Sequence, residues 1–313
     1  MANFFIAFLF SISFAPLFIE FTKRFQFKQN VRDLGPDSHR KKSGTPTLGG
    51  VIFLFSLTIT TLVFVDLNPQ ILLLLFLTLG NGLIGFSDDF IKIYFKRNLG
   101  LTSKQKLFGQ LLISGLFLYF LSKSGIDTSI FIPILDKTID LSIFYYLFIV
   151  FLIVGTTNAT NLTDGLDGLL TGTSIIAFAA FGLIALISSN WPIFFFSLAF
   201  IGSLVGFLLF NRNPAQIFMG DTGSLAIGGA LVGMAIMLKV EIILAVIGAV
   251  FVIETLSVII QVISFKFRKK RVFKMSPIHH HFELSGFEEK VVVKGFYFAG
   301  AFFGCLGVAI LMI

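Results

Sequence analysis

Five aspartates stand at positions where they could bind a metal ion and phosphate groups. Asp88 and Asp89 are adjacent, Asp164 and Asp167 are three residues apart, and Asp221 is followed by small polar residues. Neighbouring carboxylates repel one another, and near a low dielectric they are costly unless a cation compensates them. Because the chain has a single cysteine, the acids point to a hard, oxygen-binding cation, for which magnesium with phosphate is the common pairing.

Two of these acids belong to a polar stretch whose local structure the spacing leaves open. Asn158, Asn161, Asp164 and Asp167 recur every three residues, so a helical continuation would align them as one polar stripe. Both aspartates are also followed by glycine, a dipeptide typical of turns. A helix face and a turn are both compatible with the pattern.

Asp221 lies in the motif Phe218–Ser224, directly before an apolar segment. An aspartate at this place can cap the first turn of a helix. A helix start also offers free backbone N–H groups to a phosphate, with a carboxylate beside them for Mg²⁺. The motif therefore fits either a structural cap or a phosphate site.

Imidazole and ammonium groups accompany the acids. Three of the four histidines are consecutive, at His279, His280 and His281. Three consecutive side chains do not readily converge on one zinc ion, so we expect them to contact phosphate oxygens. A solvated lysine is the ordinary alternative for any single lysine. The lysines that could neutralise a pyrophosphate are Lys42, Lys92 and Lys104.

A membrane-embedded body must position these motifs. Of the 313 residues, 56% are hydrophobic and 13% are charged, whereas soluble domains have about 25% charged residues. The mean hydropathy is +0.93, and the apolar runs lack the alternation of outer-membrane barrel strands. We therefore predict an all-α integral membrane protein with about ten transmembrane helices, forming one domain over 1–313.

The ten predicted spans place the motifs on one face of the membrane. Two spans separate each motif-bearing connection from the next, so all five connections reach the same side. They are expected at about 23–47, 88–104, 161–168, 211–224 and 265–294. The apolar segments lie at roughly 3–22, 48–65, 70–87, 105–122, 142–160, 169–188, 192–210, 225–243, 244–264 and 295–313.

The distribution of basic residues predicts the orientation. Of the 24 Lys and Arg residues, 21 fall in or beside these five connections, and the other side keeps Lys123, Lys137 and Lys239. By the positive-inside rule the five connections are cytoplasmic and both termini are periplasmic. Topology and attraction to anionic membrane lipid account for the net charge of +7, so no nucleic-acid partner is expected.

Taken together, the motifs resemble those of the bacterial phospho-N-acetylmuramoyl-pentapeptide transferases. The Asp88-Asp89 pair is shared with the wider superfamily of polyprenyl-phosphate sugar-1-phosphate transferases, whereas the segment Pro277–Glu283 resembles the muramoyl-pentapeptide branch. The resemblance covers essentially the whole chain through the motifs Lys42–Thr47, Asp88-Asp89, Asn161–Gly168, Phe218–Ser224 and His279–Glu283.

The resemblance implies an enzyme of the bacterial cytoplasmic (inner) membrane. It would transfer phospho-MurNAc-pentapeptide from UDP-MurNAc-pentapeptide to undecaprenyl phosphate in peptidoglycan synthesis, release UMP and use Mg²⁺ as its cofactor. Phosphoryl transfer depends mainly on positioning and charge neutralisation. Direct attack by the lipid phosphate and a route through a covalent aspartyl phosphate both stay open.

The resemblance also implies roles for individual residues. Asp221 would bind Mg²⁺, Asp88 and Asp89 would act on the reacting phosphates, and Lys104 and His279 would contact the pyrophosphate. The implied uridine pocket comprises Lys42, Gly165, Leu166, Asp167, Asn211 and Phe218, with Phe218 stacking on the base. Other implied substrate-binding residues on this face are Lys92, Asn161, Asp164, His280 and His281.

Two other functions and the oligomeric state stay open at this point. A sister transferase that moves GlcNAc-1-phosphate to the same lipid would keep the aspartates but lack the histidine run. A transporter would place ionisable residues near the middle of its spans, where the one clear acid is Glu254. Gly229 and Gly233 form a pattern that packs helix pairs within one chain or between two chains, so a homodimer is one of two interpretations.

Overall fold

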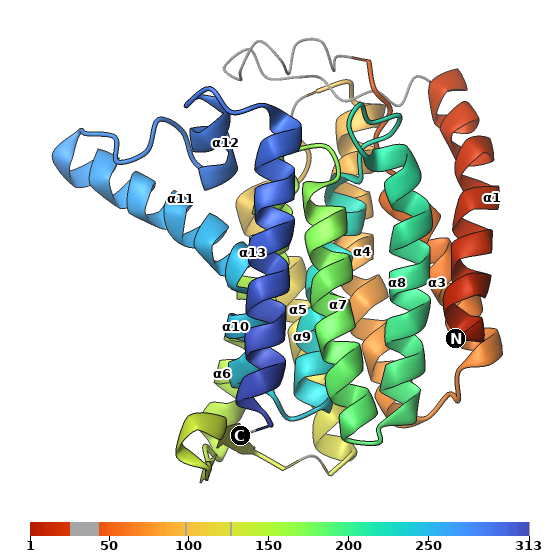
Figure 1. The fold of residues 1–313 in the computed structure, drawn as a ribbon, viewed down its shortest axis with the longest axis vertical. Coiled ribbons are helices and arrows are strands. Elements are labelled where there is room, and N and C mark those ends of the chain that lie inside the picture. The colour runs from red at the N-terminus through yellow and green to blue at the C-terminus, as the bar shows by residue number, and fades with distance from the viewer. Residues whose placement is uncertain (26–43, 98, 126, 313) are drawn as a thin grey trace.

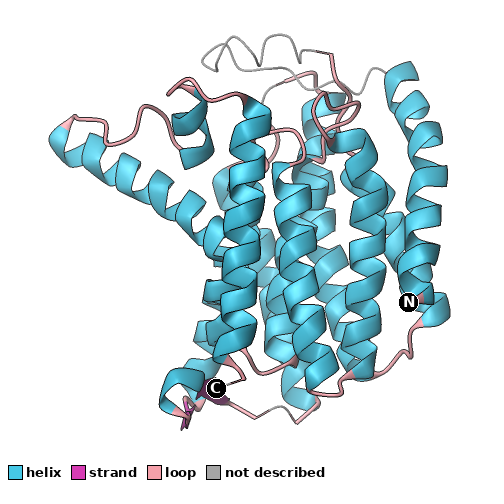
Figure 2. Ribbon diagram, viewed as in Figure 1, coloured by secondary structure: helices cyan, strands magenta, loops and turns pink. Residues whose placement is uncertain are grey.

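The computed structural model describes residues 1–25, 44–97, 99–125 and 127–312. Helices dominate, and most of them run side by side in one bundle (Figures 1 and 2). The elements are α1 (Ala2–Arg24), α3 (Gly50–Phe64), α4 (Pro69–Tyr94), α5 (Ser103–Lys123), β1 (Ser129–Ile132), the 3-10 helix η1 (Pro133–Leu135), β2 (Lys137–Asp140), α6 (Ile143–Thr163), α7 (Leu169–Ile187), α8 (Trp191–Asn211), α9 (Gly220–Met237), α10 (Glu241–Ile247), α11 (Ala249–Arg268), α12 (Ile278–Glu283) and α13 (Glu289–Ile310).

The all-α membrane character predicted from composition is confirmed. Eight of the described helices are long and apolar enough to cross a membrane, namely α1, α4, α6, α7, α8, α9, α11 and α13. Two further predicted spans correspond to α3, with 15 residues, and to α5, with 21 residues. The count of ten spans and the periplasmic location of the termini stay predictions. Figure 1 shows both termini toward one end of the bundle and α12 at the other.

Several helices extend into segments that were predicted as connections. Helix α4 continues to Tyr94, so Asp88 and Asp89 lie on a helix and not in a loop beginning at 88. Similarly, α6 ends at Thr163, and α13 already begins at Glu289. The predicted boundaries follow hydropathy, which falls at the first charged residue. A helix can continue past that residue where the charged side chains have partners, so the observed helices are longer than predicted.

The predicted span 244–264 is in fact two helices. Helix α10 ends at Ile247 and α11 begins at Ala249, with Gly248 between them. From this point α11 leans away from the bundle (Figure 1). Its outer face remains apolar and exposed, as at Ile259 and Ile263, which suits contact with lipid.

An antiparallel hairpin, absent from the sequence prediction, follows α5. Strands β1 and β2 pair Ser129 with Asp140 and Ile132 with Lys137. The ammonium of Lys239 donates to the Ser129 carbonyl at 2.6 Å, which attaches the hairpin to the turn between α9 and α10. Strands of four residues are too short to give a clear alternating pattern, so the sequence offered little signal for them.

Helix α9 is the centre of the bundle and packs most closely against α4. Glycines permit this approach: a Cβ atom at Gly229 would lie 2.6 Å from the Leu77 carbonyl oxygen, and one at Gly233 would lie 2.8 Å from the Leu74 side chain. The Gly229 and Gly233 pattern therefore packs two helices of the same chain. The homodimer stays a prediction, and these glycines no longer support it.

Candidate active site

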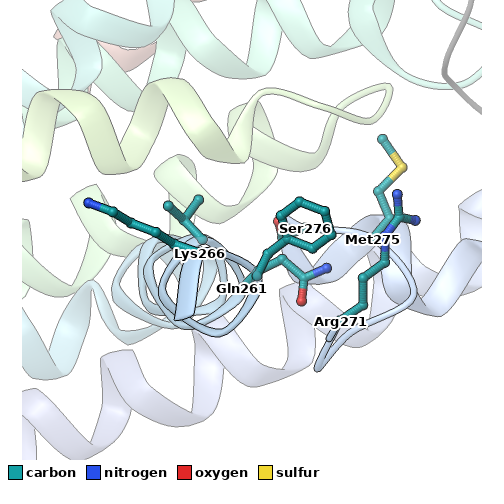
Figure 3. Close-up of a pocket in the computed structure, with 7 residues that line it drawn as sticks. Gln261, Lys266, Arg271, Met275 and Ser276 are labelled. Atoms are coloured by element: carbon teal, nitrogen blue, oxygen red, sulfur yellow. The ribbon is translucent and has the colours of Figure 1, made fainter. Parts of the chain in front are cut away.

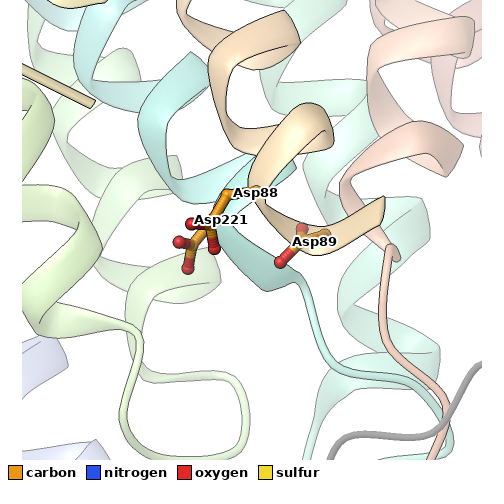
Figure 4. A group of neighbouring side chains, drawn as sticks. All are labelled: Asp88, Asp89 and Asp221. Atoms are coloured by element: carbon orange, nitrogen blue, oxygen red, sulfur yellow. The ribbon is translucent and has the colours of Figure 1, made fainter. Parts of the chain in front are cut away.

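Three carboxylates from two helices converge at one end of the bundle. Asp88 and Asp89 come from the last turns of α4, and Asp221 comes from the first turn of α9. One oxygen from each lies within 4.8 Å of the others. The Asp88 and Asp221 carboxylates lie side by side, and that of Asp89 stands apart (Figure 4). Asp88 and Asp89 are buried, whereas the Asp221 side chain is 17% exposed.

Two lysines neutralise most of this negative charge. The Lys92 ammonium forms an ion pair with Asp88 and lies 3.3 Å from Asp221 and 3.6 Å from Asp89. The Lys106 ammonium lies 3.2 Å from Asp88 and also forms an ion pair with Asp221. The three aspartates and two lysines, called the acidic cluster below, therefore carry a formal charge of −1.

The sequence predicts a pyrophosphate contact for Lys104 and no role for Lys106. Helix α5 turns Lys104 outward into solvent and Lys106 toward the acids. A signal for this existed, because Gln110 and Ser114 follow Lys106 at intervals of four and all three share one helix face. Gln110 and Ser114 are fully buried, so this face is the inner face of α5.

Backbone and hydroxyl groups fix the acids in place. Asp89 Oδ2 accepts hydrogen bonds from the Thr222 N–H at 2.9 Å and the Thr222 hydroxyl at 2.8 Å. Asp88 Oδ1 accepts from the Leu101 N–H at 2.7 Å. Helices α4 and α9 touch at backbone distance here, since a Cβ atom at Gly85 would lie only 2.0 Å from the Asp221 carbonyl oxygen.

The polar stripe considered for 158–167 is partly helix and partly turn. Asn158 and Asn161 lie on α6, which ends at Thr163, and Asp164 caps it. The Asn161 amide donates to Asp221 Oδ1 at 3.0 Å and to the Ser224 hydroxyl at 2.8 Å. Burial and the nearby charges of Asp221 and Asp89 raise the pKa of Asp164 to about 8.

The acidic cluster fits a divalent cation. It offers carboxylate oxygens, which Mg²⁺ prefers, and no thiolates. Its formal charge of −1 leaves room for a dication together with an anionic phosphate. Asp221, the predicted ligand, is the most exposed of the three acids, and Asp88 is its immediate neighbour.

A second polar group surrounds the turn 164–168. The Asp167 carboxylate accepts hydrogen bonds from the Asn213 amide at 3.2 Å and the Ala215 N–H at 3.0 Å. Leu166 is buried in a small core with Val292 and Val293 of α13. The turn and the segment 211–218 are therefore held together.

The segment 211–218 also joins the first sequence motif to this end of the bundle. Asn211 is buried, and its amide donates to the Ile217 carbonyl at 3.1 Å. The half-buried Phe218 receives a hydrogen bond at its carbonyl from the Gly49 N–H and donates its own N–H to the Pro46 carbonyl, both at 2.8 Å. Lys42, the remaining predicted pocket residue, lies outside the described residues.

The three histidines have three different environments. His279 is fully buried, with Nδ1 3.1 Å from Oε1 of Glu254, which is also fully buried. His280 lies 2.8 Å from Glu283 on the same short helix. His281 Nδ1 accepts from the Lys274 N–H at 3.1 Å. Each histidine thus contacts another group of the protein. The Glu254 and His279 side chains lie at ion-pair distance, but among the described residues their buried oxygen and nitrogen atoms make no hydrogen bond.

A cavity of about 530 Å³ lies away from the acidic cluster, between α11 and the segment that follows it (Figure 3). Its wall combines apolar side chains with two cations. The lining residues are Gln261, Val262, Phe265, Lys266, Arg271, Met275 and Ser276.

Comparisons with known proteins identify the family to which this site belongs. Residues 71–239, which hold the three aspartates of the acidic cluster, match the model of glycosyl transferase family 4. The chain is 54% identical over 309 residues to the phospho-N-acetylmuramoyl-pentapeptide-transferase of Bacillus pumilus (strain SAFR-032), covering 97% of this chain and 95% of that protein. Proteins of the same name from Oceanobacillus iheyensis (strain HTE831) and Bacillus subtilis (strain 168) are each 53% identical with the same coverage.

The chain therefore belongs to glycosyl transferase family 4 and has the multispan helical body and acidic site described above. Within that family, its similarity over nearly the full length is to the phospho-N-acetylmuramoyl-pentapeptide transferases. The resemblance predicted from the five motifs is confirmed.

Proposed function

We propose that this protein transfers phospho-MurNAc-pentapeptide from UDP-MurNAc-pentapeptide to undecaprenyl phosphate and releases UMP. The observation that carries the proposal is the acidic cluster at one end of a membrane-spanning bundle, in a chain related over nearly its full length to transferases of that name. The bundle gives access to a lipid acceptor, and the cluster suits a pyrophosphate donor.

In the proposed reaction, an oxygen of the lipid phosphate forms a bond to the sugar-bearing phosphorus of the donor. The bond from that phosphorus to the bridging oxygen breaks, and the oxygen leaves on UMP. The attacking phosphate has a second pKa of about 6 and is largely dianionic at neutral pH, so it has little need of a base. Lys92 and Lys106 instead neutralise the phosphates as they approach one another.

Asp221 would hold Mg²⁺, with Asp88 and Asp89 near enough to share in binding it. The ion would supply positive charge to the transferring and leaving phosphates. Thr222 keeps Asp89 oriented, and Asn161 keeps Asp221 oriented. This arrangement supports an electrostatic role for the aspartates in direct transfer.

The uridine end of the donor would lie over the turn 164–168 and the segment 211–218. These segments contain Gly165, Leu166, Asp167, Asn211 and Phe218, the predicted pocket residues that the structure describes. Their mutual hydrogen bonds support the grouping. The pyrophosphate would then extend toward Lys92 and Lys106.

Purified protein with undecaprenyl phosphate, Mg²⁺ and radiolabelled UDP-MurNAc-pentapeptide should form labelled lipid, and UDP-GlcNAc should not replace the donor. Activity with UDP-GlcNAc alone would instead assign the sister function. Labelled protein or stoichiometric UMP release without the lipid would favour a covalent aspartyl phosphate over direct transfer.

The cytoplasmic placement of the site is tested by labelling. Replacing Cys305, which is exposed, by Ala gives a background for single cysteines at the exposed positions Ser285 and Lys137. In intact cells, an impermeant maleimide should label Lys137→Cys and leave Ser285→Cys unlabelled until the membrane is opened. The reverse pattern would invert the proposed topology.

A further inference from the structure

The C-terminal helix holds the turn 164–168 through its backbone. The Asp167 N–H donates to Oε1 of Glu289 at 2.8 Å, and the Tyr297 hydroxyl donates to the Gly168 carbonyl at 2.7 Å. Glu289 and Tyr297 both belong to α13, which is more than 100 residues later in the chain. The position of this turn therefore depends on α13.

Glu289 also reaches the second segment of the proposed nucleotide pocket. Its Oε2 accepts a hydrogen bond from the Asn213 amide at 2.9 Å, and the same amide donates to Asp167 at 3.2 Å. One carboxylate thus uses its two oxygens on two segments that are separated by more than 40 residues. Bonds from neutral donors to an ionised carboxylate are among the stronger hydrogen bonds in proteins.

Neither of these two hydrogen bonds of Glu289 involves the acidic cluster. These two hydrogen bonds join the carboxylate to a backbone N–H and a side-chain amide, whereas Asp221 of the cluster is held by Lys92, Lys106 and Asn161. Loss of Glu289 should therefore displace the nucleotide-binding segments without removing a charge that faces the reacting phosphates.

We propose that Glu289 is a positioning residue that sets the geometry of the uridine pocket by joining Asp167 to Asn213. This inference rests on the proposed function, since it assigns the two segments to the nucleotide. Changes at Glu289 should therefore alter binding of the uridine nucleotide and leave binding of the lipid acceptor unchanged.

Glu289→Ala removes both hydrogen bonds, whereas Glu289→Gln keeps the shape and one acceptor oxygen. Because small displacements of substrate-positioning groups cost up to about a hundredfold, we expect roughly a ten- to hundredfold rise in the KM for the UDP-linked donor in Glu289→Ala. The effect should be smaller in Glu289→Gln, and kcat and the KM for undecaprenyl phosphate should change little.

Glu288→Ala is the matched control. Glu288 is the adjacent residue and carries the same charge, but it is exposed and its side chain does not cap the helix. It should bind the donor as the unmodified protein does. If Glu288→Ala weakened donor binding as much as Glu289→Ala, the loss of one negative charge would explain both effects, and the proposal would be overturned.

Binding of UMP by titration calorimetry in detergent separates the two levels of inference. If the unmodified protein does not bind UMP, the proposed function itself fails. If it binds UMP and a folded Glu289→Ala binds it equally well, the positioning role fails while the function stands. A kcat loss without a KM change would also overturn it.

If Glu289→Ala does not fold, Glu289→Gln and Tyr297→Phe decide the question. Tyr297→Phe removes one hydrogen bond from the same turn and should weaken UMP binding in the same direction. Wild-type affinity in both folded variants would overturn the proposal.

Discussion

The imidazole of His279 lies between the buried Glu254 carboxylate and the backbone of Gly165. Its Nδ1 is 3.1 Å from Glu254 Oε1, and a Cβ atom added to Gly165 would lie only 2.1 Å from its Nε2. This side chain joins α11 to the turn 164–168. Because it is fully buried between these two groups, it is placed to support the turn.

We expect His279→Ala and Glu254→Ala each to lower the melting temperature in detergent. Each leaves a buried polar partner without its counterpart, which costs about 1–3 kcal/mol. His281→Ala, from the same run but with a partly exposed ring, is the control and should melt near the unmodified protein. A double mutant that loses the full sum of the two single effects would show that the pair is not coupled.

Lys106→Ala should reduce kcat/KM far more than Lys104→Ala. Lys106 contacts Asp88 and Asp221, and removal of a charged hydrogen-bond donor costs about 1.5–3 kcal/mol, or roughly ten- to hundredfold. Lys104 is exposed two residues away. Steady-state kinetics with both substrates measure the difference, and equal losses would support the predicted pyrophosphate role of Lys104.

Chelation by EDTA should abolish turnover, and Mg²⁺ or Mn²⁺ should restore it. Asp221→Asn should raise the metal concentration needed for half-maximal activity, because one carboxylate ligand is lost. Binding of Mn²⁺, followed by electron paramagnetic resonance, gives a readout independent of activity. Unchanged Mn²⁺ affinity in Asp221→Asn would move the ligand elsewhere.

The metal-free protein should lose stability as the pH rises from about 4 to about 8 through Asp164. Its pKa is about 8 in the folded protein against the ordinary 3.8, so across this window the unfolded chain has already released the proton that the folded chain retains. Melting temperatures in EDTA should therefore fall less with pH in Asp164→Asn. Parallel curves for the two proteins would contradict the raised pKa.

The sequence could predict that the motifs lie together, because this follows from whether the number of spans between them is even or odd. An even number of spans between motifs brings Asp88, Asn161 and Asp221 to one face whatever the helices do in between, and the structure brings these side chains together. The hydrogen bond from the Phe218 N–H to the Pro46 carbonyl joins the motif Lys42–Thr47 to the same face.

The rotation of each helix about its axis does not follow from the number of spans, although the polar spacing of Lys106, Gln110 and Ser114 gave a signal for α5. Whether Lys104 or Lys106 points inward is set by how α5 packs on α6, where the Gln110 amide donates to Thr157 at 2.9 Å. The contacts of Glu254 with His279 and of Glu289 with Asp167 join segments far apart in the chain. No local spacing encodes such pairs, so residues with this kind of role emerge only from the fold.

The absence of a side chain at Gly85 has a consequence for how this site tolerates change. Because α4 and α9 meet there main chain to main chain, the separation of Asp88 from Asp221 is fixed by the backbone and not by an adjustable layer of side chains. Substitutions elsewhere in the bundle can alter side-chain packing without moving the two acids apart. One added methyl group at Gly85 would instead push α4 and α9 apart and separate them. The distance between the two carboxylates therefore depends on Gly85, a residue that has no side chain and takes no part in the chemistry.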